Sequence, residues 1–179
     1  MSDEANWRGV LVAQLTRISK PDDPDRATLA HLRRSLGETE DRVLGKAGWL
    51  FSRVPELKLS DAILGAGLFA LAKGDCPQHD TRDFGRAFGS LAGKGDNPSV
   101  EKRFIDLLDT DKADLPHKLR QAVTLIARES IGLDWKMLFA HLDGWGHPDR
   151  WVQKKWARGF WANYAEEETA ADTPAAAAT

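Results

Sequence analysis

Residues 115–128, LPHKLRQAVTLIAR, decide the fold class of this chain. Successive residues of an α-helix turn by about 100°, so side chains three or four positions apart share a face. On this projection one stripe is apolar and consists of Leu115, Leu119, Ala122, Val123 and Ile126. The opposite side is polar and consists of His117, Arg120, Thr124 and Arg128, with Lys118 at its flank. The stretch therefore predicts an amphipathic helix whose apolar stripe lies in a core.

Helix start signals recur along the chain, and no segment alternates apolar and polar residues as a half-buried strand would. Asp23-Pro24 offers an N-cap followed by proline at the first helical position. Similar signals precede apolar spacing at Thr39, Ser60, Thr81, Asn97-Pro98-Ser99, Asp114, Asp134 and His147-Pro148. With a further helix expected over residues 4–18, the sequence predicts an all-α fold of about nine helices.

The best internal boundary is residues 92–99, AGKGDNPS, which are rich in helix breakers and lack apolar spacing. We therefore expect an N-terminal helical bundle over residues 1–94 and a C-terminal bundle over residues 95–164. Each is short, so the two bundles should pack together. From residue 165 to residue 179 the chain is acidic, rich in alanine and poor in large apolar groups, which predicts a disordered tail.

Composition restricts the possible partners and compartment. The formal net charge is −2 and the pI is near 6.2, so any basic footprint for nucleic acid must be local. A single cysteine, Cys76, allows no internal disulfide and favours a reducing compartment. The acidic start does not resemble a secretory signal, and the longest apolar run, residues 62–72, is too short to span a bilayer. We expect a soluble, cytoplasmic protein without membrane contact.

Three patterns could carry metal or phosphate chemistry, and each is incomplete. Cys76 and His79 have no second pair at zinc-site spacing. The acidic run 109–114 lacks the glycine and the final glutamate of a calcium loop. Residues 89–95 resemble a phosphate loop but are one residue short and lack Ser or Thr after the lysine. We expect no metal, no cofactor and no enzymatic activity, although a catalytic pair assembled in space stays open from sequence.

Basic residues gather at several places without interspersed acids. In the helix predicted over 115–128, the polar side carries no acid before Glu129, whereas an ordinary solvated face mixes both signs. Lys102 and Arg103 fall in the first turn of their helix, where the helix dipole disfavours cations. Arg33 and Arg34 lie near a helix end, where capping explains them equally well. Arg86 follows Gly85, and that glycine indicates either a close backbone approach or loose packing.

Residues 148–161, PDRWVQKKWARGFW, predict an amphipathic closing helix. Its cationic face consists of Arg150, Lys154 and Arg158. Its apolar face consists of Val152, Trp156 and Phe160. Trp151 and Trp161 border the cationic face, and three roles stay open for them: the rim of the bundle, a contact to a partner protein, or stacking on bases.

Taken in order, these residues resemble the CasB family, the small subunit of the type I-E CRISPR surveillance complex Cascade. The resemblance covers roughly residues 25–160 and is weak over 38–80 and the tail. It rests on Leu32-Arg33-Arg34, Gly85-Arg86-Ala87, Glu101-Lys102-Arg103-Phe104, Leu119-Arg120, Asp134-Trp135 and Trp145.

The resemblance implies a non-catalytic, all-α protein of two bundles, present in two copies beside the backbone and large subunits of the complex. Its partners would be those subunits, the crRNA, and the target and displaced non-target DNA strands. The residues that match the family's basic positions are Arg33, Arg34, Arg86, Lys102, Arg103, Lys118 and Arg120. The helical projections add Arg128, Arg150, Lys154 and Arg158. The alternative is a helical adaptor whose arginines meet acidic protein surfaces without touching nucleic acid.

Overall fold

A computed structural model describes residues 6–37, 40–92 and 98–171, with side chains as far as Ala162. Its α-helices are α1 (Trp7–Ile18), α2 (Arg26–Arg34), α3 (Glu40–Ala47), α4 (Leu59–Ala72), α5 (Phe84–Ala92), α6 (Pro98–Leu108), α7 (Leu115–Arg128), α8 (Trp135–Gly144) and α9 (Trp151–Ala171). Short 3-10 turns occur at Ser35–Gly37, Gly48–Phe51 and Glu56–Lys58. The described residues form no strand beyond one isolated bridge between Gln78 and Leu133, so the predicted all-α fold is confirmed.

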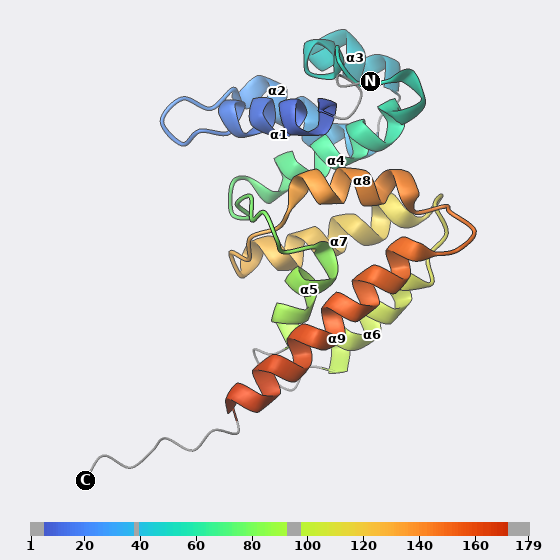
Figure 1. Ribbon diagram of the computed structural model, residues 1–179. Coiled ribbons are helices and arrows are strands. Elements are labelled where there is room, and N and C mark those ends of the chain that lie inside the picture. The colour runs from blue at the N-terminus through green and yellow to red at the C-terminus, as the bar shows by residue number, and fades with distance from the viewer. Residues whose placement is uncertain (1–5, 38–39, 93–97, 172–179) are drawn as a thin grey trace.

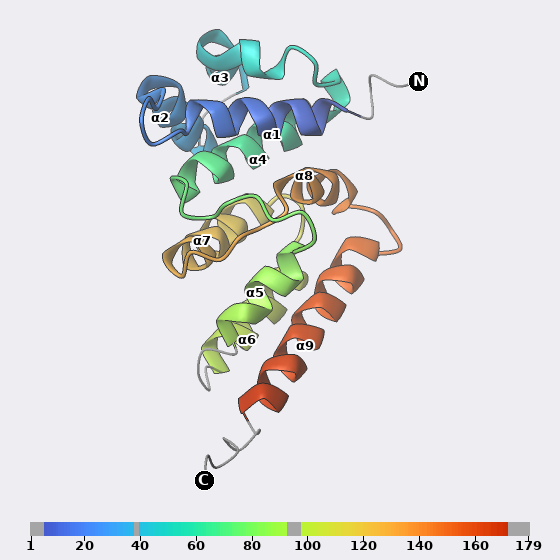
Figure 2. The same cartoon turned by 60° about the vertical axis from the view of Figure 1, so that its left-hand side comes forward.

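Helix α4 joins the N-terminal helices to α7 and α8. It packs against α2 on one side and against α7 and α8 on the other. Figures 1 and 2 show α1 to α4 gathered at one end and α5, α6 and α9 at the other, with α7 and α8 between them. The sequence of α4 explains its central position, because it is apolar all round and nine of its fourteen residues are buried.

Helix α5 belongs with the helices that follow it. It packs most extensively against α9 and also contacts α6 and α7. Asp83 accepts a hydrogen bond from the backbone N–H of Arg86 at 2.9 Å and so begins the helix. The domain boundary at residues 92–99 stays a prediction, and α5, which precedes it, packs mainly on elements that follow it.

The predicted helix ends differ from the structure at several places. The N-cap of α2 is Asp25, which accepts from the N–H of Thr28 at 3.0 Å, so the prediction of Asp23 is wrong. The N-cap predicted at Asp134 is confirmed by its bond from the N–H of Met137 at 3.0 Å. Helix α9 begins at Trp151 and continues to Ala171, past the boundary expected at residue 164. Thr39, Asn97 and residues 172–179 lie outside the described residues.

One buried apolar cluster runs through the described residues from Trp7 to Phe160. Its two largest fully buried side chains are Trp135 and Trp156. The indole of Trp156 stacks on Phe84 with ring centres 4.3 Å apart, which ties α9 to α5. No helix within the described ranges has both the length and the apolar character needed to cross a membrane.

Candidate nucleic-acid interface

A shallow groove lies between α6 and α7. Its walls are formed by Arg103 of α6 together with His117, Arg120, Gln121, Thr124, Leu125 and Arg128 of α7. Three guanidinium groups that are separate in sequence therefore face one open surface. The groove could not be derived from either helix alone, because it depends on how the two helices pack.

The buried faces of α6 and α7 orient the side chains that line the groove. Leu119, Val123 and Ile126 of α7 are fully buried, so Arg120 and Arg128 must point to solvent. Phe104 of α6 is also fully buried and stacks on Phe160 at 4.2 Å, which leaves the preceding Arg103 on the outside. The apolar stripe predicted for residues 115–128 is thus confirmed, and it orients the polar side.

A smaller hollow adjoins this groove and extends it toward α5. Arg103 and Gln121 line both, and the hollow adds Lys118 together with Asp106, Leu107 and Phe88. Asp106 places one carboxylate near the cations. Lys118 and Arg103, which sequence placed on separate helices, are therefore brought to one continuous surface.

The arginines of the groove make no ion pairs with the residues that the structure describes, whereas other cations do. Lys112 binds Asp61 at 2.8 Å and Lys136 binds Asp80 at 2.9 Å. The hydrogen bonds within the groove are local: Gln121 Nε2 lies 3.0 Å from His117 Nε2, and Thr124 donates to the Arg120 carbonyl at 2.8 Å. The guanidinium donors of the groove are consequently available to an external anion.

Arg33 and Arg34 do not belong to this groove. Arg33 lines a separate hollow formed with Arg26 and Lys73, beside Asp75 and close to the α1–α2 loop. Arg34 is exposed next to it but does not line that hollow. The structure therefore places the predicted Arg-Arg pair on the α2–α4 side of the molecule.

Lys102 and Arg86 are both exposed, but neither lines the α6–α7 groove. Arg86 lies where α5 meets α9, and its Cγ would be 3.1 Å from a Cβ placed on Gly159. These two cations therefore do not form the walls of the groove.

Arg150 has a different environment from Lys154 and Arg158, with which we grouped it. It precedes α9 and has a positive φ of 49°. Its Nη2 donates to the Leu108 carbonyl at 2.6 Å and lies 3.6 Å from Asp109. Arg150 thus closes the C-terminal end of α6, while Lys154 and Arg158 are exposed on α9.

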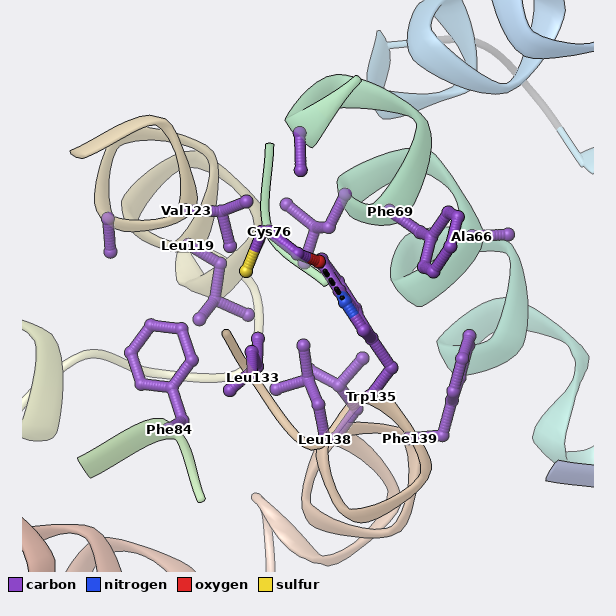
Figure 3. Close-up of a cluster of buried hydrophobic side chains, with 14 of the residues drawn as sticks. Ala66, Phe69, Cys76, Phe84, Leu119, Val123, Leu133, Trp135, Leu138 and Phe139 are labelled. Carbon is purple, nitrogen blue, oxygen red and sulfur yellow. Dashed lines mark hydrogen bonds between the residues drawn. The ribbon is translucent and has the colours of Figure 1, made fainter. Parts of the chain in front are cut away.

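Cys76 is an interior group (Figure 3). It is 3% exposed, its Sγ donates to the Ile131 carbonyl at 2.9 Å, and its own carbonyl accepts from Trp135 Nε1 at 2.9 Å. Burial raises the pKa of the thiol to about 12, so the thiolate that metal binding requires is disfavoured. Over the described ranges, no three His, Cys, Asp or Glu side chains are grouped as metal ligands would be.

Several residues on these surfaces were not predicted from the sequence. Gln121 lines both hollows of the α6–α7 interface, and Arg26 and Lys73 join Arg33. Lys155 is exposed beside Lys154. A helical projection could have found Lys155, but Lys73 follows the end of α4 in a left-handed conformation that periodicity does not predict.

Comparisons with known proteins show which protein family the chain is similar to. Residues 28–161 match the sequence model of the family described as CRISPR-associated protein Cse2. A CRISPR-associated protein Cse2 from Thermus thermophilus is 40% identical over 104 residues, which cover 58% of this chain and 57% of that protein. The matched segment therefore spans little more than half of that relative's length.

Solved structures share the fold over most of the chain. M. ruber CasB is 32% identical with a TM-score of 0.70, covering 93% of this chain and 99% of that one. A crystal structure of a Cse2-family protein from Thermus thermophilus is 29% identical with a TM-score of 0.71, covering 87% and 97%. A chain of a CRISPR RNA-guided surveillance complex has a TM-score of 0.73 at 18% identity, covering 94% and 99%, which shows likeness of fold alone.

Proposed function

The chain belongs to the family of CRISPR-associated Cse2 proteins, also named CasB, and on this basis we propose that it is the small subunit of a Cascade surveillance complex of type I-E. In this role it stabilises the R-loop formed by crRNA and target DNA, together with the displaced non-target strand. Its partners are the backbone and large subunits and a second copy of this chain.

The observation that carries the proposal is the convergence of Arg103, Arg120 and Arg128 on the α6–α7 groove. An arginine presents a fork of N–H donors that matches two phosphate oxygens. Several such forks on an open surface bind the backbone of a strand and do not read its bases. Sequence specificity then resides in guide pairing, and the protein contributes affinity for the backbone.

The groove favours binding over catalysis. Its described walls hold guanidinium, imidazole, hydroxyl and amide groups but no carboxylate or thiol, and Asp106 supplies the one carboxylate of the adjoining hollow. The imidazole of His117 is hydrogen-bonded to Gln121. We therefore propose a non-catalytic subunit whose contribution is electrostatic.

The direct test removes the three arginines together. In the Arg103→Ala, Arg120→Ala, Arg128→Ala variant, we expect affinity for single-stranded DNA to fall by about tenfold or more, since each phosphate contact contributes. In a complex reconstituted with crRNA, the lifetime of the R-loop should shorten while assembly stays complete. A variant with Arg42, Lys46 and Arg53 changed to alanine removes the same charge from exposed positions elsewhere and serves as the control.

The same experiment distinguishes an adaptor that binds only protein. Unchanged DNA affinity together with failed assembly of the triple variant would mean that the arginines meet an acidic protein surface. Size-exclusion chromatography of the reconstituted complex reads assembly, and strand displacement over time reads the R-loop.

A further inference from the structure

The outward face of α9 combines cations with two exposed indoles. Trp151, Lys154, Lys155, Arg158 and Trp161 follow one another at helical spacing and are all exposed. The exposed fractions are 39% for Trp151 and 43% for Trp161, whereas Trp156 and Phe160 of the same helix are fully buried. The two indoles therefore mark the ends of a cationic stripe.

Neighbouring side chains hold both indoles in place without covering them. The Trp151 ring lies against Gly144, where a Cβ would come within 2.8 Å of Cε2, and meets the edge of His141 at 5.6 Å. The Trp161 ring meets Phe160 edge-on at 5.0 Å and 87°. Because the two indoles are already held by their neighbours, they lose less conformational entropy when a ligand binds.

Trp151 also differs from three of the buried tryptophans in its hydrogen bonding. Trp135, Trp145 and Trp156 each donate Nε1 to an acceptor within the protein, at 2.9, 3.0 and 2.8 Å. Trp151 donates to none among the described residues, and 39% of its surface is exposed. A large aromatic surface that is anchored and half exposed is typical of a contact for an external group.

The charge of this face has a single sign. No Asp or Glu occurs from Arg150 to Tyr164. Lys154, Lys155 and Arg158 make no ion pair within the described parts of the chain. Lys154 lies in the first turn of α9, where the helix dipole disfavours a cation, and a bound polyanion would offset that cost.

We propose that this face of α9 is a second binding surface for single-stranded nucleic acid, in which bases stack on Trp151 and Trp161 and phosphates meet the cations between them. This inference rests on the proposed function and adds base stacking to it. Ten helical residues separate the indoles, a rise of about 15 Å. That distance corresponds to about four nucleotides of a stacked strand at about 3.4 Å each.

The composition of the face favours a nucleic acid over a protein helix. A protein helix docks through a continuous apolar stripe at positions i, i+3, i+4 and i+7. Here those inner positions are Lys154, Lys155 and Arg158, and apolar groups occur only at the two ends. Aromatic platforms beside a row of cations are characteristic of sites that track a strand.

The experiment compares an oligonucleotide with its abasic equivalent. The full-length chain is titrated with a fluorescently labelled 15-mer of thymidine and with a 15-mer of abasic sites, which has the same phosphates but no bases. We expect the wild type to bind the thymidine oligomer about tenfold more tightly than the abasic one. The Trp151→Leu, Trp161→Leu variant should lose about tenfold in affinity for the thymidine oligomer and almost none for the abasic one, because only stacking is removed.

Three further variants keep the result interpretable. Trp49→Leu removes an indole of equal exposure, 43%, from the 3-10 turn Gly48–Phe51, and should change neither affinity. Trp151→Phe, Trp161→Phe retains aromatic rings and should restore most of the preference. Thermal unfolding of each variant shows whether it is folded, and Trp161→Leu alone, which leaves the Gly144 contact intact, should give a partial loss.

Each outcome distinguishes this inference from the proposed function. Equal wild-type affinity for the two oligomers, or an unchanged preference in the double leucine variant, would overturn base stacking and leave the arginine groove standing. Loss of complex assembly without loss of the preference would overturn it in favour of a protein contact. Failure of the wild type to bind either oligomer would overturn both proposals.

Discussion

Gly85 of α5 lies directly against the backbone of Trp156 in α9. A Cβ placed on Gly85 would come within 2.7 Å of both Cα and the carbonyl carbon of Trp156, and closer still to its carbonyl oxygen. Backbone atoms in the middle of a helix cannot shift aside as a flexible side chain can. The absence of a side chain at Gly85 therefore sets how closely α5 and α9 approach, and so determines the stacking of Phe84 on Trp156.

We predict that Gly85→Ala lowers the free energy of unfolding by about 1–3 kcal/mol or more, because the helices must separate. Gly45→Ala is the matched control, since nothing lies within 4 Å of a Cβ at that exposed position of α3. There alanine should be neutral or stabilising by about 0.5–1 kcal/mol through helix propensity. Urea unfolding measures both, and equal stability of the two variants would contradict the close contact.

The buried pair of His141 and Trp156 makes stability depend on pH. Trp156 Nε1 lies 2.8 Å from His141 Nδ1, which must accept and hence be unprotonated. Burial, with a smaller contribution from the charge of Lys155, lowers the pKa of His141 to about 4 from an ordinary value of 6.5. Between these pH values His141 is protonated in the unfolded chain but not in the folded chain. The free energy of unfolding therefore falls as the pH drops from 6.5 to 4.

Over that window the loss attributable to His141 approaches about 3 kcal/mol, most of it between pH 6.5 and pH 5. His141→Gln keeps an acceptor for the indole but does not titrate, so its stability should depend less on pH in this range. The readout is the urea midpoint at pH 7, 6 and 5 for both proteins. An identical pH slope in the two proteins would mean that His141 does not carry the effect.

The parts of the fold that sequence predicted are those determined by local spacing. The stripe from Leu115 to Ile126 and the cap at Asp134 depend on residues a few positions apart, and both are confirmed. The resemblance to CasB is confirmed as well. Gly85 allowed two interpretations from sequence, because its neighbour Trp156 is seventy-one residues away and only packing brings them together.

The candidate site was less predictable for the same reason. Periodicity indicated that Arg120 and Arg128 face solvent, but not that Arg103 of another helix faces them across a groove. Arg150 fits the four-residue spacing of Lys154 and Arg158, yet its positive φ places it outside the helix. Positions beyond a helix end are the ones where a projection at constant angle fails.

The start of α2 provides a test that separates the sequence prediction from the structure. Asp25 accepts from both the N–H and the Oγ1 of Thr28, at 3.0 and 2.7 Å, and these bonds lower the pKa of its carboxyl group. We predict that Asp25→Ala lowers the free energy of unfolding by about 1 kcal/mol. Asp23→Ala, at the position that the sequence suggested, should change it by less than about 0.5 kcal/mol. Thermal melts at pH 7 compare the two, and a larger effect at Asp23 would show that the helix begins elsewhere.

Arg150 and Arg158 should separate into two classes of effect. Arg150→Ala removes the donor that satisfies the Leu108 carbonyl, so we expect a loss of stability of about 0.5–1 kcal/mol and little change in strand affinity. Arg158→Ala, on the exposed face of α9, should leave stability unchanged and weaken binding of single-stranded DNA about twofold to fivefold. Unfolding and binding are measured on the same preparations. If Arg150→Ala weakened DNA binding as much as Arg158→Ala, Arg150 would belong to the binding surface.

The salt dependence of binding counts the phosphates that the α6–α7 groove neutralises. For a single strand, the slope of log affinity against log salt changes by about 0.7 for each phosphate contact. If Arg103, Arg120 and Arg128 each meet one phosphate, replacing all three by alanine should reduce the magnitude of that slope by about 2. A general loss of positive charge would affect the slope of the Arg42, Lys46, Arg53 variant equally, since both lose three cations from exposed positions. The measurement is fluorescence anisotropy with a labelled 15-mer at four salt concentrations, and parallel slopes for the groove variant and the wild type would show that these arginines do not contact the strand.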